Sequence, residues 1–490
     1  MKLNFRKLIA SLPEGDVIAI RGDAEIDSVS GDTRRLRQGG VFVCLRGLHE
    51  DGHERIAEAS ELASAIVAER EDALTGDCGL PYAIVKNTRR ALAYLAAALA
   101  GNPQKDLSLI AVTGTNGKTS TVQMLDCIFR GAGYRSAVIG TIAMAEMGGT
   151  MTTPDPEELY PMLHRFAEDG ITHVFMEASS HALALDKLAP VTFEVGIFTN
   201  LTPDHMDFHG SMEAYRAAKE KLFLQCRCGL FNLDDPTGEI FHMNVPCRAY
   251  GYSAERDADF YASSVDCRAE GISYMLNGAD VTCRIPGSFT VYNTMAAIGA
   301  AVLCGVPLER AVGAIASLEG VKGRMERLKL PDGSDIDVII DYAHTPDALE
   351  KLLRSVREFA VGRHITLIFG CGGDRDSSKR RIMGSIATRL ADFVIVTADN
   401  SRSEPTTEIL RGIMKGIDRE KPHAVIISRE SAIRYALHTS RPGEIILIAG
   451  KGHEEYEINA TGKHRFSERE IVICAAKERL AFGKTEREQF

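Results

Sequence analysis

The sequence predicts an α/β protein of three domains, and three observations support this. At about 150 residues per domain, a chain of 490 residues has room for three. The middle of the chain opens with an apolar run, a glycine-rich turn and a helical stretch, and the last third alternates strand-like runs with helical segments. We expect a small α/β domain over residues 1–103, a central α/β domain with a parallel sheet over 104–327, and a doubly wound, Rossmann-like α/β domain over 328–490.

The composition excludes several classes of protein. Hydrophobic residues make up 45% of the chain and charged residues 25%, which are ordinary values for a soluble globular protein. The net charge of -10 argues against a protein that binds nucleic acid by charge alone. The first apolar run is too short for a signal peptide, and no run of about 18 apolar residues could span a membrane. The eleven cysteines form no C-x-x-C pair and indicate free thiols in a reducing compartment, so a cytoplasmic location is expected.

The apolar pattern gives the expected elements of the first two domains. Residues 41–45 predict a buried strand, and residues 89–99 predict a helix that ends at Gly101-Asn102-Pro103, the first domain boundary. In the central domain, residues 107–113 predict a strand and residues 118–130 a helix, and THVFMEA and VGIFTN predict further strands. Short alternating runs over residues 245–285 predict a small antiparallel piece.

The last third contains strand-like runs separated by helical segments, enough for a separate doubly wound domain. These runs are DVIIDYA, ITLIFGCG, FVIVTADN, AVIISR and EIILIAGKG. Thr345 and Pro346 are expected to begin a helix, the first as its cap and the second as its first residue.

The strongest local signal for chemistry is AVTGTNGKTS, residues 111–120. A strand, a glycine turn and a helix in this order place backbone N–H groups and a helix N-terminus around phosphate oxygens. Lys118 can reach the β- and γ-phosphates, and the Thr119 hydroxyl can bind Mg²⁺. Val112 stands where the general pattern has glycine, so the loop is a shortened variant. The alternative is a strand–helix turn with no ligand. The residues expected to bind the nucleotide here are Gly114, Thr115, Asn116, Gly117, Lys118, Thr119 and Ser120.

Two polar residues follow strands that should end beside this loop. Glu177 closes THVFMEA, and His205 lies in the loop after VGIFTN. A carboxylate and an imidazole from neighbouring strand ends can complete a Mg²⁺ or Mn²⁺ site, although a lone loop histidine is more often solvated. Lys219 lies in the helical stretch YRAAKEKLF, and its spacing alone favours an exposed helix lysine.

Polar loops also follow the strands of the last third. Asp341 and His344 stand at a strand end, and GGDRDSSKRR, ADNSRSEP and AGKGHEEYE follow three other strands. Loops that share one sheet edge can form a pocket for a zwitterionic or anionic small molecule, whereas each loop alone could simply face solvent.

Taken in order, these segments resemble the Mur ligases from end to end, and among them those that add the third residue to UDP-N-acetylmuramoyl-L-alanyl-D-glutamate. The motifs that carry the resemblance are GDTRRLRQGGVFVCLRGLHEDGH, TGTNGKTS, TTPDP, MEASSHAL, TNLTPDHMDFHG, AAKEKLF, GRME, DYAHTPDALEKLL, GGDRD, DNSR and GKGHE. The resemblance implies a UDP-substrate-binding first domain, a central P-loop ATPase-like domain and a last domain that binds the incoming amino acid.

The resemblance also implies roles for single residues. Lys118 and Thr119 would contact the γ-phosphate and Mg²⁺, and Glu177 and His205 would bind a second metal ion. Lys219 would be carbamylated and help to hold metal. Asn293 and Arg324 would contact the nucleotide, and Asp341 and His344 would close over ATP. The residues for the UDP-muramoyl-peptide are Thr33, Arg34, Thr152, Thr153, Ser179 and Lys187. For the incoming amino acid they are Arg375, Asn400, Arg402, Gly450 and Glu454. The chain departs from the family pattern at Thr33, where serine is usual, at Leu185 and Lys187, where several relatives have Gln and Arg, and at Ser401, where proline is usual.

The implied activity is amide-bond formation through an acyl phosphate, with ATP as the phosphate donor. The incoming amino acid is meso-diaminopimelate or L-lysine, and Arg402 favours meso-diaminopimelate because a guanidinium pairs well with its second carboxylate. The alternative functions are a folylpolyglutamate synthase-like ligase, another Mur ligase, and a nucleotide-binding paralogue without turnover. A monomer is expected, with neither nucleic acid nor membrane as a partner.

Overall fold

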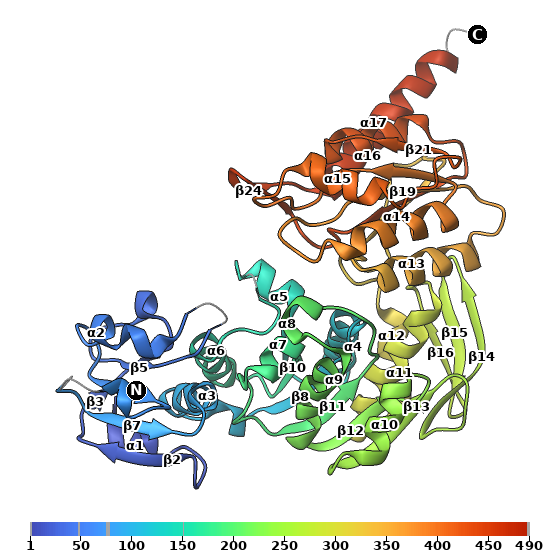
Figure 1. The fold of residues 1–490 in the computed structure, drawn as a ribbon. Helices are drawn as coiled ribbons and strands as arrows, with labels where there is room; N and C mark the ends of the chain where they lie inside the picture. The colour runs from blue at the N-terminus through green and yellow to red at the C-terminus, as the bar shows by residue number, and fades with distance from the viewer. Residues whose placement is uncertain (1, 48–49, 75–78, 150, 488–490) are drawn as a thin grey trace.

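The structure is a computed structural model, and it describes residues 2–47, 50–74, 79–149 and 151–487. Leu48 and His49, which belong to the first family motif, lie outside the described residues. Strands and helices gather in three regions that follow one another along the chain, shown from blue to green to orange in Figure 1. No helix in the described part of the chain is long and apolar enough to cross a membrane.

The first region is a mixed sheet with the strand order β2-β7-β6-β5-β4, in which only β2 runs antiparallel to its neighbour. The strands of this region are β1 (Leu3–Asn4), β2 (Val17–Arg21), β3 (Glu25–Ile26), β4 (Val29–Ser30), β5 (Val41–Val43), β6 (Ala65–Ala68) and β7 (Tyr82–Val85). Its helices are α1 (Phe5–Ile9), α2 (Ile56–Ala59) and α3 (Thr88–Leu99), with short 3-10 turns η1 (Thr33–Arg35), η2 (Gly52–Arg55), η3 (Asp72–Leu74) and η4 (Pro103–Lys105). The buried strand and the helix expected here are confirmed as β5 and α3.

The central region is a long sheet with the order β16-β15-β14-β13-β12-β11-β8-β10-β9. Its strands are β8 (Ser108–Thr113), β9 (Ser136–Ile139), β10 (His173–Glu177), β11 (Phe193–Phe198), β12 (Cys226–Asn232), β13 (Arg248–Ser253), β14 (Phe260–Arg268), β15 (Gly271–Leu276) and β16 (Ala279–Cys283). Its helices are α4 (Lys118–Gly131), α5 (Thr141–Glu146), α6 (Pro156–Glu168), α7 (Ser180–Ala184), α8 (Met206–His209), α9 (Met212–Glu220), α10 (Pro236–Asn244), α11 (Ser288–Leu303) and α12 (Leu308–Ser317), with a 3-10 turn η5 (Lys221–Leu224).

The segment 245–285 differs from its prediction in one respect. Strands β14, β15 and β16 are antiparallel, as expected. They do not form a separate piece, however, because β13 pairs in parallel with β12 and β14 pairs in parallel with β13, so the hairpins extend the central sheet. The alternating sequence predicted the hairpins, but it contained no signal for this pairing.

The third region is a sheet with the order β17-β18-β22-β19-β20-β21, parallel except for β17. Its elements are β17 (Glu326–Arg327), β18 (Asp337–Asp341), α13 (Pro346–Phe359), β19 (Ile365–Phe369), α14 (Ser378–Leu390), β20 (Phe393–Val396), α15 (Thr406–Met414), β21 (His423–Val425), α16 (Arg429–Thr439), β22 (Ile445–Ala449), β23 (Tyr456–Asn459), β24 (Gly462–Arg465) and α17 (Glu468–Arg487). Thr345 caps α13 and Pro346 begins it, as predicted. The third sheet begins at β17, whose two residues are the last two of the central domain expected over residues 104–327, and that division stays a prediction.

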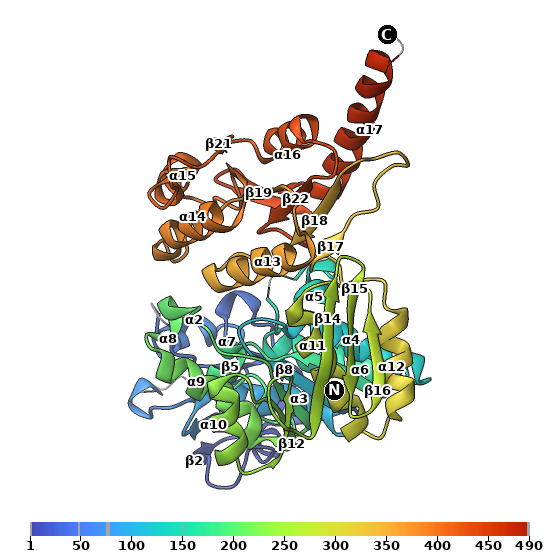
Figure 2. The same ribbon diagram turned by 90° about the vertical axis from the view of Figure 1, so that its right-hand side faces the viewer.

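The three regions contact one another through a few elements. Helix α3 of the first region packs against α6 of the second, and α13 of the third packs against α11 and β14. Figure 2 shows α13 lying directly above the central region, between its helices and the third sheet. The α/β class with mainly parallel sheets is therefore confirmed, and the carboxyl ends of β8, β10 and β18 lie near the interface of the second and third regions.

Candidate active site

The turn between β8 and α4, residues 114–117, is here called the glycine loop. Gly114 has φ 146° and Gly117 has φ 89°, backbone angles that residues with a side chain rarely adopt. A Cβ on Gly114 would collide with the Thr199 hydroxyl, and one on Gly117 would lie 2.5 Å from the amide oxygen of Asn293. The close approach of Thr199 and Asn293 therefore requires glycine at both positions. Asn293, on α11, faces this loop, and its contact with a nucleotide stays a prediction.

Lys118 is the first residue of α4 and folds back over the glycine loop. Its Nζ donates to the carbonyl oxygens of Gly114 at 2.9 Å and Thr115 at 2.8 Å. Burial lowers the pKa of Lys118, and the carboxylates of Glu177 and Asp204 partly offset this. The ammonium group is thus held by neutral carbonyls at a helix N-terminus, where a phosphate could replace them as its partner.

Thr119 and Glu177 are in direct contact beside Lys118. The Thr119 hydroxyl donates to Glu177 Oε2 at 3.1 Å, and the backbone N–H and hydroxyl of Thr141 donate to the same carboxylate at 2.8 and 3.1 Å. Only 1% of Glu177 is exposed. A hydroxyl next to a buried carboxylate is an oxygen donor set that suits Mg²⁺. Thr141 was not predicted from the sequence, because a threonine after a short strand has no distinctive motif.

His205 lies further out in the loop before α8. It has φ 55°, its Nε2 is 3.5 Å from Asp204 Oδ2, and its ring centroid is 4.8 Å from that of His181. Burial, partly offset by Asp204, lowers the pKa of His205, which favours the neutral imidazole. Among the described residues, no three His, Cys, Asp or Glu side chains gather closely enough to hold a metal ion.

Lys219 corrects the expectation drawn from its spacing, because it is buried and not an exposed helix lysine. Only 1% of it is exposed, and its Nζ lies 4.4 Å from the ring centroid of Tyr215, one turn earlier on α9. The Tyr215 hydroxyl is 3.2 Å from the Thr115 hydroxyl, which ties α9 to the glycine loop. Burial and the nearby charge of Lys118 lower the pKa of Lys219. Helical spacing could not reveal this, since the glycine loop that helps to bury α9 lies about a hundred residues earlier.

Asp347 of the third region and Arg324, just before β17, contact the glycine loop and the residues around it. Asn116 Nδ2 donates to Asp347 Oδ2 at 2.8 Å, and the Thr202 hydroxyl donates to the same atom at 3.1 Å. The guanidinium of Arg324 donates to the Thr119 hydroxyl at 3.0 Å and lies 4.4 Å from the ring centroid of Tyr342. These contacts join the two regions at the expected nucleotide site.

Asp341 ends β18, and His344 follows Tyr342 in the loop after it. Asp341 accepts backbone hydrogen bonds from Met325 and Ala343, both at 2.8 Å, and its burial raises the pKa of the carboxyl group. His344 Nδ1 is 2.9 Å from the carbonyl oxygen of Tyr342, and burial, together with Lys379, lowers the pKa of His344.

The residues expected to bind the muramoyl-peptide fall into two groups. Near Glu177, the Thr153 hydroxyl is hydrogen-bonded to the Glu177 carbonyl at 2.7 Å and to Ser179 at 3.1 Å, and the hydroxyls of Thr152 and Thr141 are 3.1 Å apart. The Lys187 Nζ is ion-paired with Asp155 at 2.7 Å.

Thr33 and Arg34 lie apart from this group, in η1 of the first region. Arg34 pairs with Asp32 at 2.8 Å and leaves 86% of its side chain exposed. The first region is tied to the central one through α6, where Glu157 accepts from the Gly31 N–H at 3.2 Å. The uridine-diphosphate role of Thr33 and Arg34 stays a prediction.

Four of the five residues expected to bind the amino acid form one cluster at the carboxyl edge of the third sheet. Asn400 Nδ2 donates to Glu454 Oε2 at 2.7 Å, and a Cβ on Gly450, which has φ 118°, would lie 2.7 Å from Asp399. Arg402 Nη1 donates to the carbonyls of Gly373 at 2.8 Å and Asn400 at 3.4 Å. Arg375, the fifth, is exposed on the neighbouring loop.

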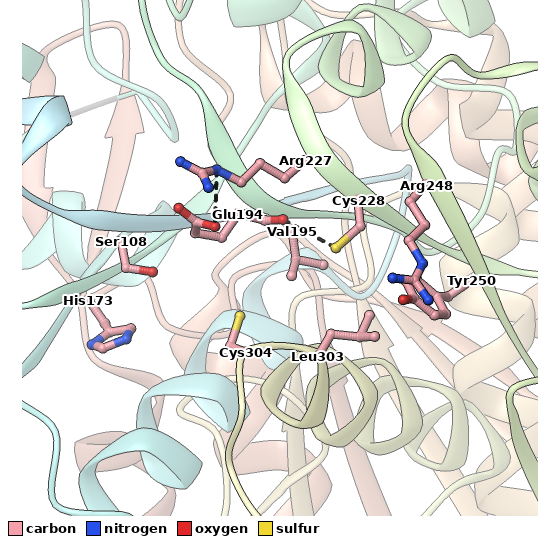
Figure 3. A pocket seen from close by; sticks show the side chains of 10 residues that line it. All are labelled: Ser108, His173, Glu194, Val195, Arg227, Cys228, Arg248, Tyr250, Leu303 and Cys304. Carbon is pink, nitrogen blue, oxygen red and sulfur yellow. Dashed lines mark hydrogen bonds and ion pairs between the residues drawn. The ribbon is translucent and has the colours of Figure 1, made fainter.

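A cavity of about 360 Å³ lies at the amino ends of the strands of the central sheet. Figure 3 shows the side chains that line it. Ser108 and His173, the first residues of β8 and β10, line it, together with an ion pair between Arg227 and Glu194 at 3.3 Å. Ligands of open α/β sheets bind at the carboxyl ends of the strands. This cavity is therefore separate from the candidate active site.

Fold and site together define a class, the α/β proteins that bind nucleotide phosphates between a buried strand and a helix. The chain also matches the models of two families, "Mur ligase middle domain" over residues 112–301 and "Mur ligase, glutamate ligase domain" over residues 323–452.

The chain is also similar to ligases along nearly its whole length. It is 38% identical over 97% of its length to the complete UDP-N-acetylmuramoyl-L-alanyl-D-glutamate–2,6-diaminopimelate ligase of Clostridioides difficile, and 40% identical over 92% to the enzyme of that name from Syntrophomonas wolfei, 94% of which is covered. A solved structure of a ligase of the same name superimposes with a TM-score of 0.68 at 29% identity, over 98% of this chain and 99% of that one. The chain belongs to the Mur ligase family.

Proposed function

We propose that the chain is an ATP-dependent ligase that adds meso-diaminopimelate to UDP-N-acetylmuramoyl-L-alanyl-D-glutamate in peptidoglycan precursor synthesis. The proposal is supported above all by the hydrogen bond of Asp347, in the third region, with Asn116 of the glycine loop. Arg324, just before β17, contacts Thr119 beside it. A nucleotide site and an amino-acid site on different domains can then act on one reaction. A cytoplasmic location accompanies the proposal, because its substrates are ATP and a nucleotide-linked precursor.

The first step is phosphoryl transfer. The carboxylate of the D-glutamyl residue attacks the γ-phosphorus of ATP, the bond to the β-phosphate oxygen breaks, and ADP leaves. Lys118 exchanges its loop carbonyls for phosphate oxygens and neutralises charge on the transferring group. Arg324, already bonded to Thr119, adds a second positive charge from the domain interface. The product is an acyl phosphate.

The second step is amide formation. The neutral amine of the amino acid attacks the acyl carbon and a tetrahedral intermediate forms. The bond from the acyl carbon to the phosphate oxygen then breaks, and inorganic phosphate leaves with the proton that the amine loses. Water would hydrolyse the acyl phosphate, so the contacts of Asp347 with Asn116 and Thr202 would help to keep the two regions together during the reaction.

Mg²⁺ fits the oxygen atoms that the chain presents at Thr119 and Glu177. When bound, it would offset the negative charge of the phosphates. His205, held in its neutral form, and a carbamylated Lys219 are proposed as further ligands. The buried Lys219 amine supports this proposal, because a lysine with a lowered pKa supplies the neutral amine that CO₂ must meet.

The preference for meso-diaminopimelate rests on Arg402. Its Nη1 donates to two backbone carbonyls, and because a guanidinium has five N–H groups, donors remain for a ligand carboxylate. Glu454 supplies an acceptor for an ammonium group nearby. Meso-diaminopimelate carries both groups at its distal end, whereas L-lysine carries only the ammonium.

Arg402→Ala is expected to lower kcat/KM for meso-diaminopimelate by roughly a hundredfold or more and to change kcat/KM for L-lysine little, because only the first substrate loses a paired carboxylate. Steady-state phosphate release with each amino acid measures this. Arg411→Ala is the matched control, since Arg411 lies exposed on α15 and pairs with Glu408. Equal losses with both amino acids would show that Arg402 does not read the second carboxylate.

The acceptor separates this proposal from a folylpolyglutamate synthase and from a paralogue without turnover. ATP-dependent phosphate release should require UDP-N-acetylmuramoyl-L-alanyl-D-glutamate together with the amino acid, and folates should not replace it. Phosphate release with folates in place of the nucleotide precursor would favour a folylpolyglutamate synthase. No release with any acceptor would favour a paralogue without turnover.

A further inference from the structure

Lys451 is a fully buried lysine that the proposed reaction does not use. It follows β22, and 0% of it is exposed. Its Nζ donates to Asn400 Oδ1 at 2.8 Å and to the carbonyl oxygen of Tyr456 at 2.9 Å, and it lies 3.6 Å from Asp399 and 3.8 Å from Glu454. A buried ammonium is tolerated only when it is paired and hydrogen-bonded. Lys451 is therefore held in one position, at the base of the amino-acid cluster.

This contact determines what Asn400 can offer to a ligand. Its Oδ1 accepts from Lys451 Nζ and from the backbone N–H of Ile458, at 2.8 and 3.0 Å. An amide oxygen has two acceptor sites, so both are filled. Both partners are donors, so the amide atom that faces them must be the oxygen, and the NH₂ group of Asn400 points the other way. One N–H of Asn400 donates to Glu454, and the second is left for a ligand.

The cluster is consequently polarised. Asn400 presents an N–H donor and Arg402 presents N–H donors with a positive charge, a combination that suits a carboxylate. Glu454 keeps acceptor sites for an ammonium group. Burial and the neighbouring Asp399 raise the pKa of Glu454, and the charge of Lys451 opposes this rise, so Lys451 also helps to keep Glu454 ionised.

We propose that Lys451 is a positioning residue that fixes the Asn400 amide with its N–H toward the incoming amino acid, and so contributes to selection for a distal carboxylate. This inference rests on the proposed function and deepens it. Lys451 itself touches Asn400 and Tyr456, and it acts on the substrate only through Asn400 and Glu454.

The test is Lys451→Met, which keeps the length of the side chain and removes its charge and donors. The KM for meso-diaminopimelate should rise roughly tenfold or more, the ratio of kcat/KM for meso-diaminopimelate to that for L-lysine should fall, and the KM for ATP should stay unchanged. Lys463→Met is the control, because Lys463 is exposed on β24 and its Nζ lies 3.9 Å from the centroid of the Tyr456 ring. General damage to the fold would lower kcat/KM for meso-diaminopimelate and for L-lysine alike. The ratio of the two values would then stay unchanged, which would overturn the inference.

Asn400→Asp provides a second variant in case Lys451→Met does not fold. The new carboxylate still accepts from Lys451 and from the Ile458 N–H, but it has no N–H to donate. The same ratio should fall, and an unchanged ratio would contradict the orientation of Asn400. If the wild-type protein turns over neither amino acid, the proposed function fails and the inference fails with it. Normal wild-type turnover with an unchanged ratio in the variants overturns only the inference.

Discussion

Lys118→Ala is expected to lower turnover by roughly a hundredfold or more while the protein stays folded, because it removes a pre-organised charge from the phosphoryl-transfer step. In the part of the chain that the structure describes, the Lys118 Nζ donates to two loop carbonyls and forms no ion pair, so its loss should leave the fold intact. Steady-state phosphate release measures the effect, and thermal unfolding checks that the variant is folded.

Lys105→Ala is the matched control, since Lys105 is an exposed lysine just before β8. It should retain the wild-type rate. A folded Lys118→Ala protein with near-normal turnover would show that the glycine loop does not handle the transferred phosphate.

Lys219→Ala is expected to remove most of the activity, because it deletes the amine that the proposed carbamate requires. The amine is buried against Tyr215 beside the glycine loop, and a neutral amine is the form that reacts with CO₂. Short carboxylic acids, added to the variant, should partly restore turnover by filling the space with an equivalent carboxylate.

Glu213→Ala, on the exposed side of the same helix, is the control and should behave as wild type. Incubation of the wild-type protein with isotopically labelled bicarbonate should also give a carbamate signal in the carbon NMR spectrum that is absent from Lys219→Ala. A fully active Lys219→Ala variant, or identical spectra for the two proteins, would rule out a functional carbamate.

Local patterns predicted the parts of the site that depend on local structure. The glycine loop was predictable because a buried strand, two glycines and Lys-Thr stand next to one another in the chain. Glu177 was predictable because a polar residue that ends a buried strand in a parallel sheet lies at the ligand edge.

Features that depend on distant segments were not predictable in this way. In the sequence, Lys219 and Lys451 resemble surface lysines. In the fold, the glycine loop with Thr115 packs near Lys219, and Asn400 is hydrogen-bonded to Lys451, so both lysines are buried by distant segments. The pairing of β13 with β14 and the early start of the third sheet at β17 likewise depend on contacts that no local pattern encodes. The family resemblance implied a role for Lys219, whereas its burial became visible only in the fold.

The most direct test of the proposed function is phosphate release by the wild-type protein with UDP-N-acetylmuramoyl-L-alanyl-D-glutamate, ATP and a panel of amino acids. We propose that the cluster of Asn400, Arg402 and Glu454 pairs the carboxylate and the ammonium at the distal end of the amino acid. A site that is built to pair such a group rejects an analogue lacking it by several orders of magnitude. We therefore predict release with meso-diaminopimelate that exceeds release with L-lysine by a wide margin, and a product mass that equals the nucleotide precursor plus one diaminopimelyl residue. Equal or faster release with L-lysine would contradict the assignment.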